Sequence, residues 1–283
     1  MQILAATDFS TRSNRALRQA GLLAQAGGAQ LHVLHVVDDD QPDELVGMEV
    51  REAERLLAQQ SDSMPELWGV RPRRVVITGD PFDGILRAAT EIGADLIVMG
   101  SHRKQLLDIF VGTTIERVIR RGAFPVLMVN NDVQRKYENV VAAIDMSDAS
   151  ANALRVALST GLISSRATLV HAFFPLGKGK MSIAGSDQGS IDSYVANERR
   201  WVTDELAKFL VASDLSQTPW SFRVEEGAAM EIISRAVSEM RPDLLVMGTQ
   251  GRSAMLKLLI GSVTEEALRS LNVDILAVPP GKR

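Results

Sequence analysis

The stretch TGDPFDGILRAATEIGADLIVMGS (Thr78–Ser101) decides the fold, because it occurs twice in the chain. Its second copy, EGAAMEIISRAVSEMRPDLLVMGT (Glu226–Thr249), aligns with it without a gap. Each copy combines an amphipathic, helix-like segment with a continuous aliphatic run that ends in glycine. A repeat of this length indicates that the chain consists of two copies of one domain.

The similarity between the halves extends to their first strands. The segment ILAATDFS near the N-terminus resembles VAAIDMSD in the second half, which places Asp8 opposite Asp145. The segment LHVLHVV resembles ATLVHAF, which places His35 opposite His171. We interpret both histidines as packed, hydrogen-bonded residues rather than metal ligands.

Continuous runs of Val, Ile and Leu predict strands that are covered on both faces, as in a parallel sheet. Because these strands alternate with amphipathic helices, each half is predicted to be a doubly wound α/β domain. Domain one is expected to cover residues 1–131 and domain two residues 138–283. We predict irregular connections at Asp38–Gly47 and Pro175–Ser190, the second of them Gly- and Ser-rich and mobile. The strands predicted in the first half are Gln2–Thr7, Gln30–Val37, Arg73–Thr78, Leu96–Gly100 and Val126–Asn130.

The composition restricts the class of protein. The chain has 283 residues, of which 46% are hydrophobic, and its 31 basic and 35 acidic residues leave a small negative charge. This balance argues against nucleic acid as a partner, since phosphate backbones are bound through concentrated Lys and Arg. We find no signal-like start and no apolar run long enough for a membrane span. The absence of cysteine suits the cytoplasm, where we expect the protein.

A glycine motif follows the last repeated strand of domain two. Gly248, Gly251 and Gly261-Ser262 stand between this strand and a helix, at the carboxyl edge where α/β sheets bind ligands. Gly251 permits a positive φ and lets backbone amides approach an anion without a Cβ in the way. Ser262 and Glu265 also have capping-box spacing, which explains the hydroxyl but not the three glycines.

The pattern G-x2-G-x9-G-[ST] resembles the ATP-binding signature of the universal stress protein family, and the resemblance covers almost the whole chain. It implies a Rossmann-like domain, of the adenine nucleotide alpha hydrolase-like kind, with a five-stranded parallel sheet of order 3-2-1-4-5. It also implies that ATP, with or without Mg²⁺, binds across the ends of strands one and four. The nucleotide-binding positions that it implies are Asp145, Ala172, Gly248, Gly251, Arg252, Gly261, Ser262 and Val263.

Domain one lacks the middle glycine of this motif. The missing residue shortens the loop by up to about 3.3–3.6 Å, whereas a hydrogen bond tolerates donor–acceptor distances of only about 2.7–3.2 Å. We therefore expect domain one to bind ATP weakly or not at all. The remnants of its site are Asp8, Val36, Gly100, Arg103, Gly112 and Thr113.

The sequence contains no set of catalytic residues that we can identify, and no GxxxxGK[ST] loop or HExxH motif. The leading hypothesis is a stress-response protein that binds ATP in domain two and acts as a regulator or adaptor, with at most slow hydrolysis. The alternative is a scaffold of the same fold that binds no nucleotide, or binds another small ligand. The resemblance implies that the final strand of each half pairs the domains as a pseudo-dimer; a homodimer and an unidentified protein partner are open.

Overall fold

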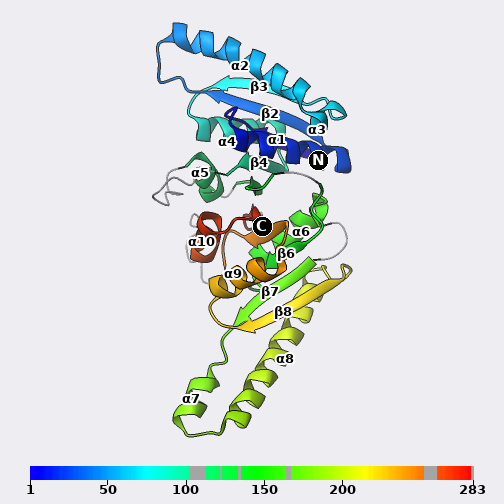
Figure 1. Ribbon diagram of the computed structural model, residues 1–283, viewed down its shortest axis with the longest axis vertical. Helices are drawn as coiled ribbons and strands as arrows, with labels where there is room; N and C mark the ends of the chain where they lie inside the picture. The colour runs from blue at the N-terminus through cyan, green and yellow to red at the C-terminus, as the bar shows by residue number, and fades with distance from the viewer. Residues whose placement is uncertain (102–112, 122, 133–134, 164–166, 252–259, 282–283) are drawn as a thin grey trace.

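The computed structural model describes residues 1–101, 113–121, 123–132, 135–163, 167–251 and 260–281. Their strands form one ten-stranded sheet with the order β3-β2-β1-β4-β5-β10-β9-β6-β7-β8 (Figure 1). Each half contributes five parallel strands in the order 3-2-1-4-5 that the family resemblance implies. The two tandem α/β domains are therefore joined edge to edge through their sheets.

Domain one follows the predicted alternation of strands and helices. Three of its five strands have the predicted bounds, while β1 and β5 end one residue earlier than predicted. Its elements are β1 (Gln2–Ala6), α1 (Thr11–Gly27), β2 (Gln30–Val37), α2 (Asp43–Ser63), α3 (Pro65–Trp68), β3 (Arg73–Thr78), α4 (Pro81–Ile92), β4 (Leu96–Gly100), α5 (Thr114–Arg121) and β5 (Val126–Val129).

Domain two repeats this order, with a longer helical excursion between its second and third strands. Its elements are β6 (Val140–Ala143), α6 (Asp148–Ser159), β7 (Ala167–Phe173), α7 (Gly177–Ile183), α8 (Gln188–Ala212), β8 (Trp220–Glu226), α9 (Ala229–Met240), β9 (Leu244–Gly248), α10 (Ser262–Ser270) and β10 (Asp274–Val278).

The sheet separates two layers of buried side chains. Because strand residues alternate between faces, Ile3 and Ala5 of β1 belong to one cluster and Leu4 between them belongs to the other. Helices α1, α2, α6 and α8 pack in the first layer, and α4, α5, α9 and α10 pack in the second. Among the described residues, no helix has the length and apolarity that crossing a bilayer requires.

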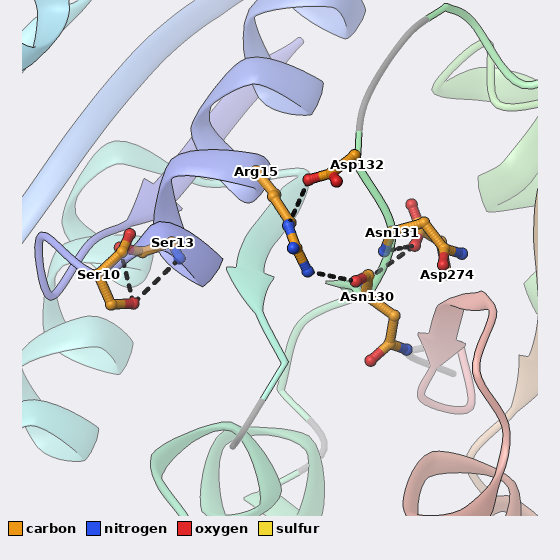
Figure 2. A network of polar contacts seen from close by, with 7 residues as sticks. All are labelled: Ser10, Ser13, Arg15, Asn130, Asn131, Asp132 and Asp274. Atoms are coloured by element: carbon orange, nitrogen blue, oxygen red, sulfur yellow. Dashed lines mark hydrogen bonds and ion pairs between the residues drawn. The ribbon is translucent and has the colours of Figure 1, made fainter. Parts of the chain in front are cut away.

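The two domains meet where β5 and β10 pair antiparallel, with Met128 opposite Ile275. Asp274 begins β10 and is only 3% exposed. Its Oδ1 accepts hydrogen bonds from the amides of Asn130 (2.8 Å) and Asn131 (3.0 Å), as Figure 2 shows. Its Oδ2 accepts a third from the Tyr137 hydroxyl at 2.7 Å. This carboxylate therefore ties the start and the end of the interdomain junction to domain two.

The prediction of an irregular segment at Pro175–Ser190 is wrong, because most of it is helical. Helix α7 lies beside α8, and the two extend away from the sheet (Figure 1). The amide of Gly177 donates to the Tyr194 hydroxyl at 3.0 Å, and Lys178 pairs with Glu226 at 2.7 Å. These contacts join residues far apart in the sequence, so the local composition gave no sign of them. The first-half segment Asp38–Gly47 is irregular only as far as Pro42, since α2 begins at Asp43.

Candidate functional site

Domain two contains a cavity of about 850 Å³ at the carboxyl ends of β6, β7 and β9. Its wall includes residues from all three strand ends and from the first turns of α9 and α10. The structure thus brings seven of the predicted positions together, and the eighth, Arg252, lies outside the described residues. The seven that line the cavity are Asp145, Ala172, Gly248, Gly251, Gly261, Ser262 and Val263.

Asp145 is held by the turn that leads into α6. Its Oδ1 accepts hydrogen bonds from the Ser147 hydroxyl at 2.5 Å and from the Ser150 hydroxyl at 2.6 Å. The preceding strand leads into a turn in which Met146 has a φ of 60°. Left-handed backbone costs a residue with a side chain about 1–2 kcal/mol. The turn thus stores strain at the point where it presents the carboxylate to the cavity.

Gly251 faces this carboxylate at close range. A Cβ on Gly251 would lie 2.9 Å from Oδ2 of Asp145, which is closer than van der Waals contact allows. Gly251 does not use the positive φ that glycine permits, since its backbone lies outside the left-handed region. Glycine is required here by the lack of space beside Asp145 rather than by the backbone conformation.

The start of α10 forms the opposite wall of the cavity. Gly261 is the residue that precedes the helix, and its amide donates to the carbonyl of Thr249 at 2.8 Å. The expected capping role of Ser262 is wrong: Ser262 is the first helical residue, and the helix has no side-chain cap. Thr264 instead donates to the carbonyl of Gly248 at 2.8 Å. The Ser262 hydroxyl is therefore left at the cavity, beside the positive end of the helix dipole.

Phe174 also lines this cavity, and the sequence analysis missed it. It follows β7 directly, beyond Ala172, and is 65% exposed. The remaining wall on this side is apolar, with contributions from Val170, Ile233 and Met247. An aromatic residue placed immediately after a strand end was the available signal, because ligands of such sheets bind at that edge. The cavity therefore has an apolar, aromatic part and a polar part formed by the glycines and Asp145.

Domain one has a smaller cavity, of about 250 Å³, at the equivalent strand ends. Asp8, Val36, Gly100 and Thr113 line it, while Arg103 and Gly112 lie outside the described residues. Here the hydroxyl does act as a cap, because Thr113 accepts a hydrogen bond from the amide of Glu116 at 3.2 Å. The matching hydroxyls of the two halves thus have different roles.

In both cavities a histidine of the second strand is hydrogen-bonded to the backbone that follows the first strand. His35 and His171 each place Nδ1 2.8 Å from a carbonyl oxygen, of Thr7 and Ile144 respectively, so Nδ1 carries the proton in both. This agrees with the interpretation of both histidines as packed, hydrogen-bonded residues. Burial acts to raise the pKa of Asp8, but hydrogen bonds from Ser10 and Ser13 outweigh it, so that this pKa lies below its ordinary value.

The described residues do not contain three or more carboxylate or imidazole groups gathered as a metal site. In domain two the side-chain oxygen ligands on the described wall of the cavity come from the carboxylate of Asp145, the amide of Gln250 and the hydroxyls of Ser150, Ser262 and Thr264. Mg²⁺ is bound in many proteins by one or two carboxylates together with substrate phosphates. The cavity is therefore consistent with a metal that enters together with a phosphate ligand.

Comparison with known proteins identifies relatives for both halves. The sequence model described as the Universal stress protein family matches residues 1–130 and again residues 136–279. A universal stress protein of Methanocaldococcus jannaschii is 26% identical over 152 residues, which cover 45% of this chain and 93% of the relative. Universal stress protein E of Escherichia coli is 22% identical over 216 residues, covering 73% of this chain and 67% of the relative.

A solved structure shows the same two-domain fold. The crystal structure of a universal stress protein from Archaeoglobus fulgidus superposes with a TM-score of 0.70, covering 99% of this chain and 98% of that one. The sequences of the two are 20% identical, so this likeness concerns the fold alone.

Proposed function

The chain belongs to the universal stress protein family, whose members act in the stress response, and we propose that its second domain binds ATP. In this proposal the protein is a nucleotide-dependent regulator or adaptor. The observation that carries the proposal is the cavity of about 850 Å³ lined by seven of the eight positions that the family signature implies. A volume of 300–1,000 Å³ is typical of small-molecule sites.

The two parts of the cavity suit the two parts of a nucleotide. The adenine base would lie in the apolar part, against Ala172 and the exposed ring of Phe174. The phosphates would lie at Gly251, Gly261 and Ser262, where the N-terminus of α10 offers backbone amides and a positive dipole end. If Mg²⁺ accompanies the phosphates, Asp145 and Ser262 are the oxygen donors for it.

A regulator fits the described residues better than a dedicated enzyme does. Asp145 is the carboxylate that lines the cavity, and its Oδ1 already accepts hydrogen bonds from Ser147 and Ser150. His171 places Nδ1 against a backbone carbonyl, so this nitrogen is not available as a general base. We therefore propose at most slow hydrolysis of bound ATP.

We propose that domain one binds ATP weakly or not at all. Its cavity has a volume of about 250 Å³, less than the range typical of sites for ligands of this size. We also propose domain bounds of 1–131 and 138–283. The last strand of domain one ends at Val129 and the first strand of domain two begins at Val140, which supports these bounds. The cytoplasm remains our expected compartment.

An interaction protein without a nucleotide is the second candidate, and helix α7 favours it. Leu176, just before this helix, and Ile183 at its end are 87% and 90% exposed. Large apolar side chains that are exposed close together are typical of a surface that binds another protein. Mass spectrometry of ligands released from protein purified without added nucleotide separates the candidates. Release of about one adenine nucleotide per chain supports the proposed function, and its absence supports the interaction protein.

Isothermal titration calorimetry with ATP tests the proposed site. We expect one ATP per chain for the native protein and at least about a hundredfold weaker binding for Gly251→Leu, since the added side chain enters the space beside Asp145. Gly179→Leu is the matched control, because a Cβ at Gly179 meets open space. A native protein that binds no ATP, or a Gly251→Leu variant that binds it normally, contradicts the proposal.

A further inference from the structure

The cavity of domain one differs from that of domain two in charge as well as in size. Gly100 packs against the backbone of Arg12 in the same way as Gly248 packs against the backbone of Ala149. The first turn of α1 therefore corresponds to that of α6, with Thr11-Arg12 in place of Asp148-Ala149. One carboxylate is lost and one guanidinium is gained, so domain one is more positive at this point by two charges.

Arg12 lines the cavity of domain one. It is half-buried, and its side chain makes no ion pair or hydrogen bond with any residue that the structure describes. Arg15, one turn further along α1, behaves differently: it pairs with Asp132 at 2.6 Å and donates to the carbonyl of Asn130 at 3.0 Å (Figure 2). The charge of Arg15 is thus compensated within the protein, whereas Arg12, on the wall of the cavity, has no such partner among the described residues.

The N-terminus of α1 adds to this positive potential. Ser10 lines the cavity there, and the first turn of α1 contains no acidic residue that would offset its dipole. The helices α4 and α5 also begin at the cavity, but their first turns contain Asp83 and Glu116. A half-buried guanidinium beside the N-terminus of α1 is an arrangement that favours phosphate over neutral groups.

The other polar groups of the cavity indicate what the phosphate is attached to. Asp8 lines the same wall, and because its pKa lies below the ordinary value it is ionised at neutral pH. An ionised carboxylate accepts hydrogen bonds and so favours hydroxyl groups on a ligand. The hydroxyls of Ser101 and Thr113 lie on the wall as well.

The volume of the domain-one cavity indicates the size of ligand that fits it. An apolar cavity of about 150 Å³ holds benzene, so the 250 Å³ found here corresponds to a ligand of about ten non-hydrogen atoms. We propose that domain one binds a small hydroxylated phosphomonoester, with Arg12 on the phosphate and Asp8 on a hydroxyl. Glycerol 3-phosphate has this size and chemistry. The proposal does not depend on ATP binding by domain two.

Calorimetric titration of the full chain with glycerol 3-phosphate tests this site. We expect binding by the native protein, about tenfold or more weaker binding by Arg12→Ala, and an intermediate loss for Arg12→Lys, which keeps the charge but not the two-pronged geometry. Arg18→Ala is the control, since Arg18 is exposed on the same helix and does not line the cavity. Thermal unfolding of each variant checks that it is folded.

Two further titrations identify the group that is recognised. Glycerol is expected not to bind, and inorganic phosphate to bind more weakly than glycerol 3-phosphate but with the same dependence on Arg12. The Gly251→Leu variant is expected to bind glycerol 3-phosphate as the native protein does, because its substitution lies in domain two. The proposal is overturned if native protein shows no binding at millimolar ligand, if Arg12→Ala binds as tightly as native protein, or if Gly251→Leu loses this binding.

Discussion

The two ends of the sheet present the same strand ends with different surroundings. In both halves an aspartate follows the first strand, and a residue with a φ of 60°, Phe9 or Met146, follows the aspartate. In both halves a histidine of the second strand bonds to the carbonyl of the residue before that aspartate. The cavities nevertheless measure about 250 Å³ and 850 Å³.

The two halves differ at residues that follow strands or begin helices, outside the paired strands of the sheet. Arg12 replaces Ala149 at a helix start, and Asp38 stands after β2 where Phe174 stands after β7. Of these four residues only Ala149 is buried, and it belongs to helix α6 rather than to a strand. The comparison teaches that two copies of one scaffold can keep their packing while a few residues at the strand ends change the ligand that fits.

The largest expected effect concerns the junction, where Asp274 replaces Pro125 of domain one. Asp274→Ala leaves the buried Tyr137 hydroxyl and two partly buried amides without an acceptor. Since an unpaired buried donor costs about 1–3 kcal/mol, we expect a loss of about 3 kcal/mol in the free energy of unfolding. Asp274→Asn keeps an oxygen for the two backbone amides and should lose much less. Urea unfolding measures both, and equal losses in the two variants would contradict the role given to these hydrogen bonds.

The second prediction compares the glycines that end β4 and β9. A Cβ at Gly100 would lie 2.6 Å from the backbone of Arg12, whereas a Cβ at Gly248 would lie 3.1 Å from Ala149. Since overpacking costs about 1–3 kcal/mol, we expect Gly100→Ala to be near the upper end of this range and Gly248→Ala near or below the lower end. Thermal unfolding of the two variants tests the order, and a larger loss for Gly248→Ala would contradict it.

The third prediction transfers a residue from one cavity to the other. Phe174→Asp introduces the residue that domain one has at this position, removes an aromatic contact and adds a negative charge near the nucleotide. Aromatic contacts contribute about 0.5–1.5 kcal/mol, so we expect ATP affinity to fall by about tenfold in a calorimetric titration. Phe174→Trp is the control and should bind as the native protein does. If Phe174→Asp binds ATP normally, the ring does not contact the base.

The strands and the edge that holds both cavities could be predicted from the sequence, because continuous aliphatic runs and the internal repeat are local signals. Seven residues that the glycine motif and the family resemblance imply line one cavity, because these positions lie at strand ends or at the start of α10. The role of Gly251 could not be predicted, since it depends on the distance to Asp145 across the cavity. Helix α7 was missed because Tyr194 and Glu226, remote in sequence, hold it in place.

The smallest expected effect concerns pH: the contributions of two carboxylates to the stability of the fold change in opposite directions as the pH rises. Burial raises the pKa of Asp274, although hydrogen bonds from Tyr137 and two amides oppose it, so this residue stabilises the fold below about pH 3.8, and that contribution is lost as the pH rises through its raised pKa. The pKa of Asp8 is lowered, so its contribution is present above about pH 3.8 and is lost as the pH falls through the lowered pKa.

Substitution by asparagine separates these two contributions. Between about pH 3.5 and pH 7, Asp274→Asn should gain stability relative to the native protein as the pH rises, because the cost of ionising a buried carboxyl is removed. Asp8→Asn should lose stability relative to the native protein over the same range, by well under about 1 kcal/mol, since Asp8 is exposed and its interactions are screened by water. Urea unfolding at several pH values measures both differences. If the two variants change in the same direction, the junction carboxylate of domain two and the cavity carboxylate of domain one do not differ in the way their surroundings require.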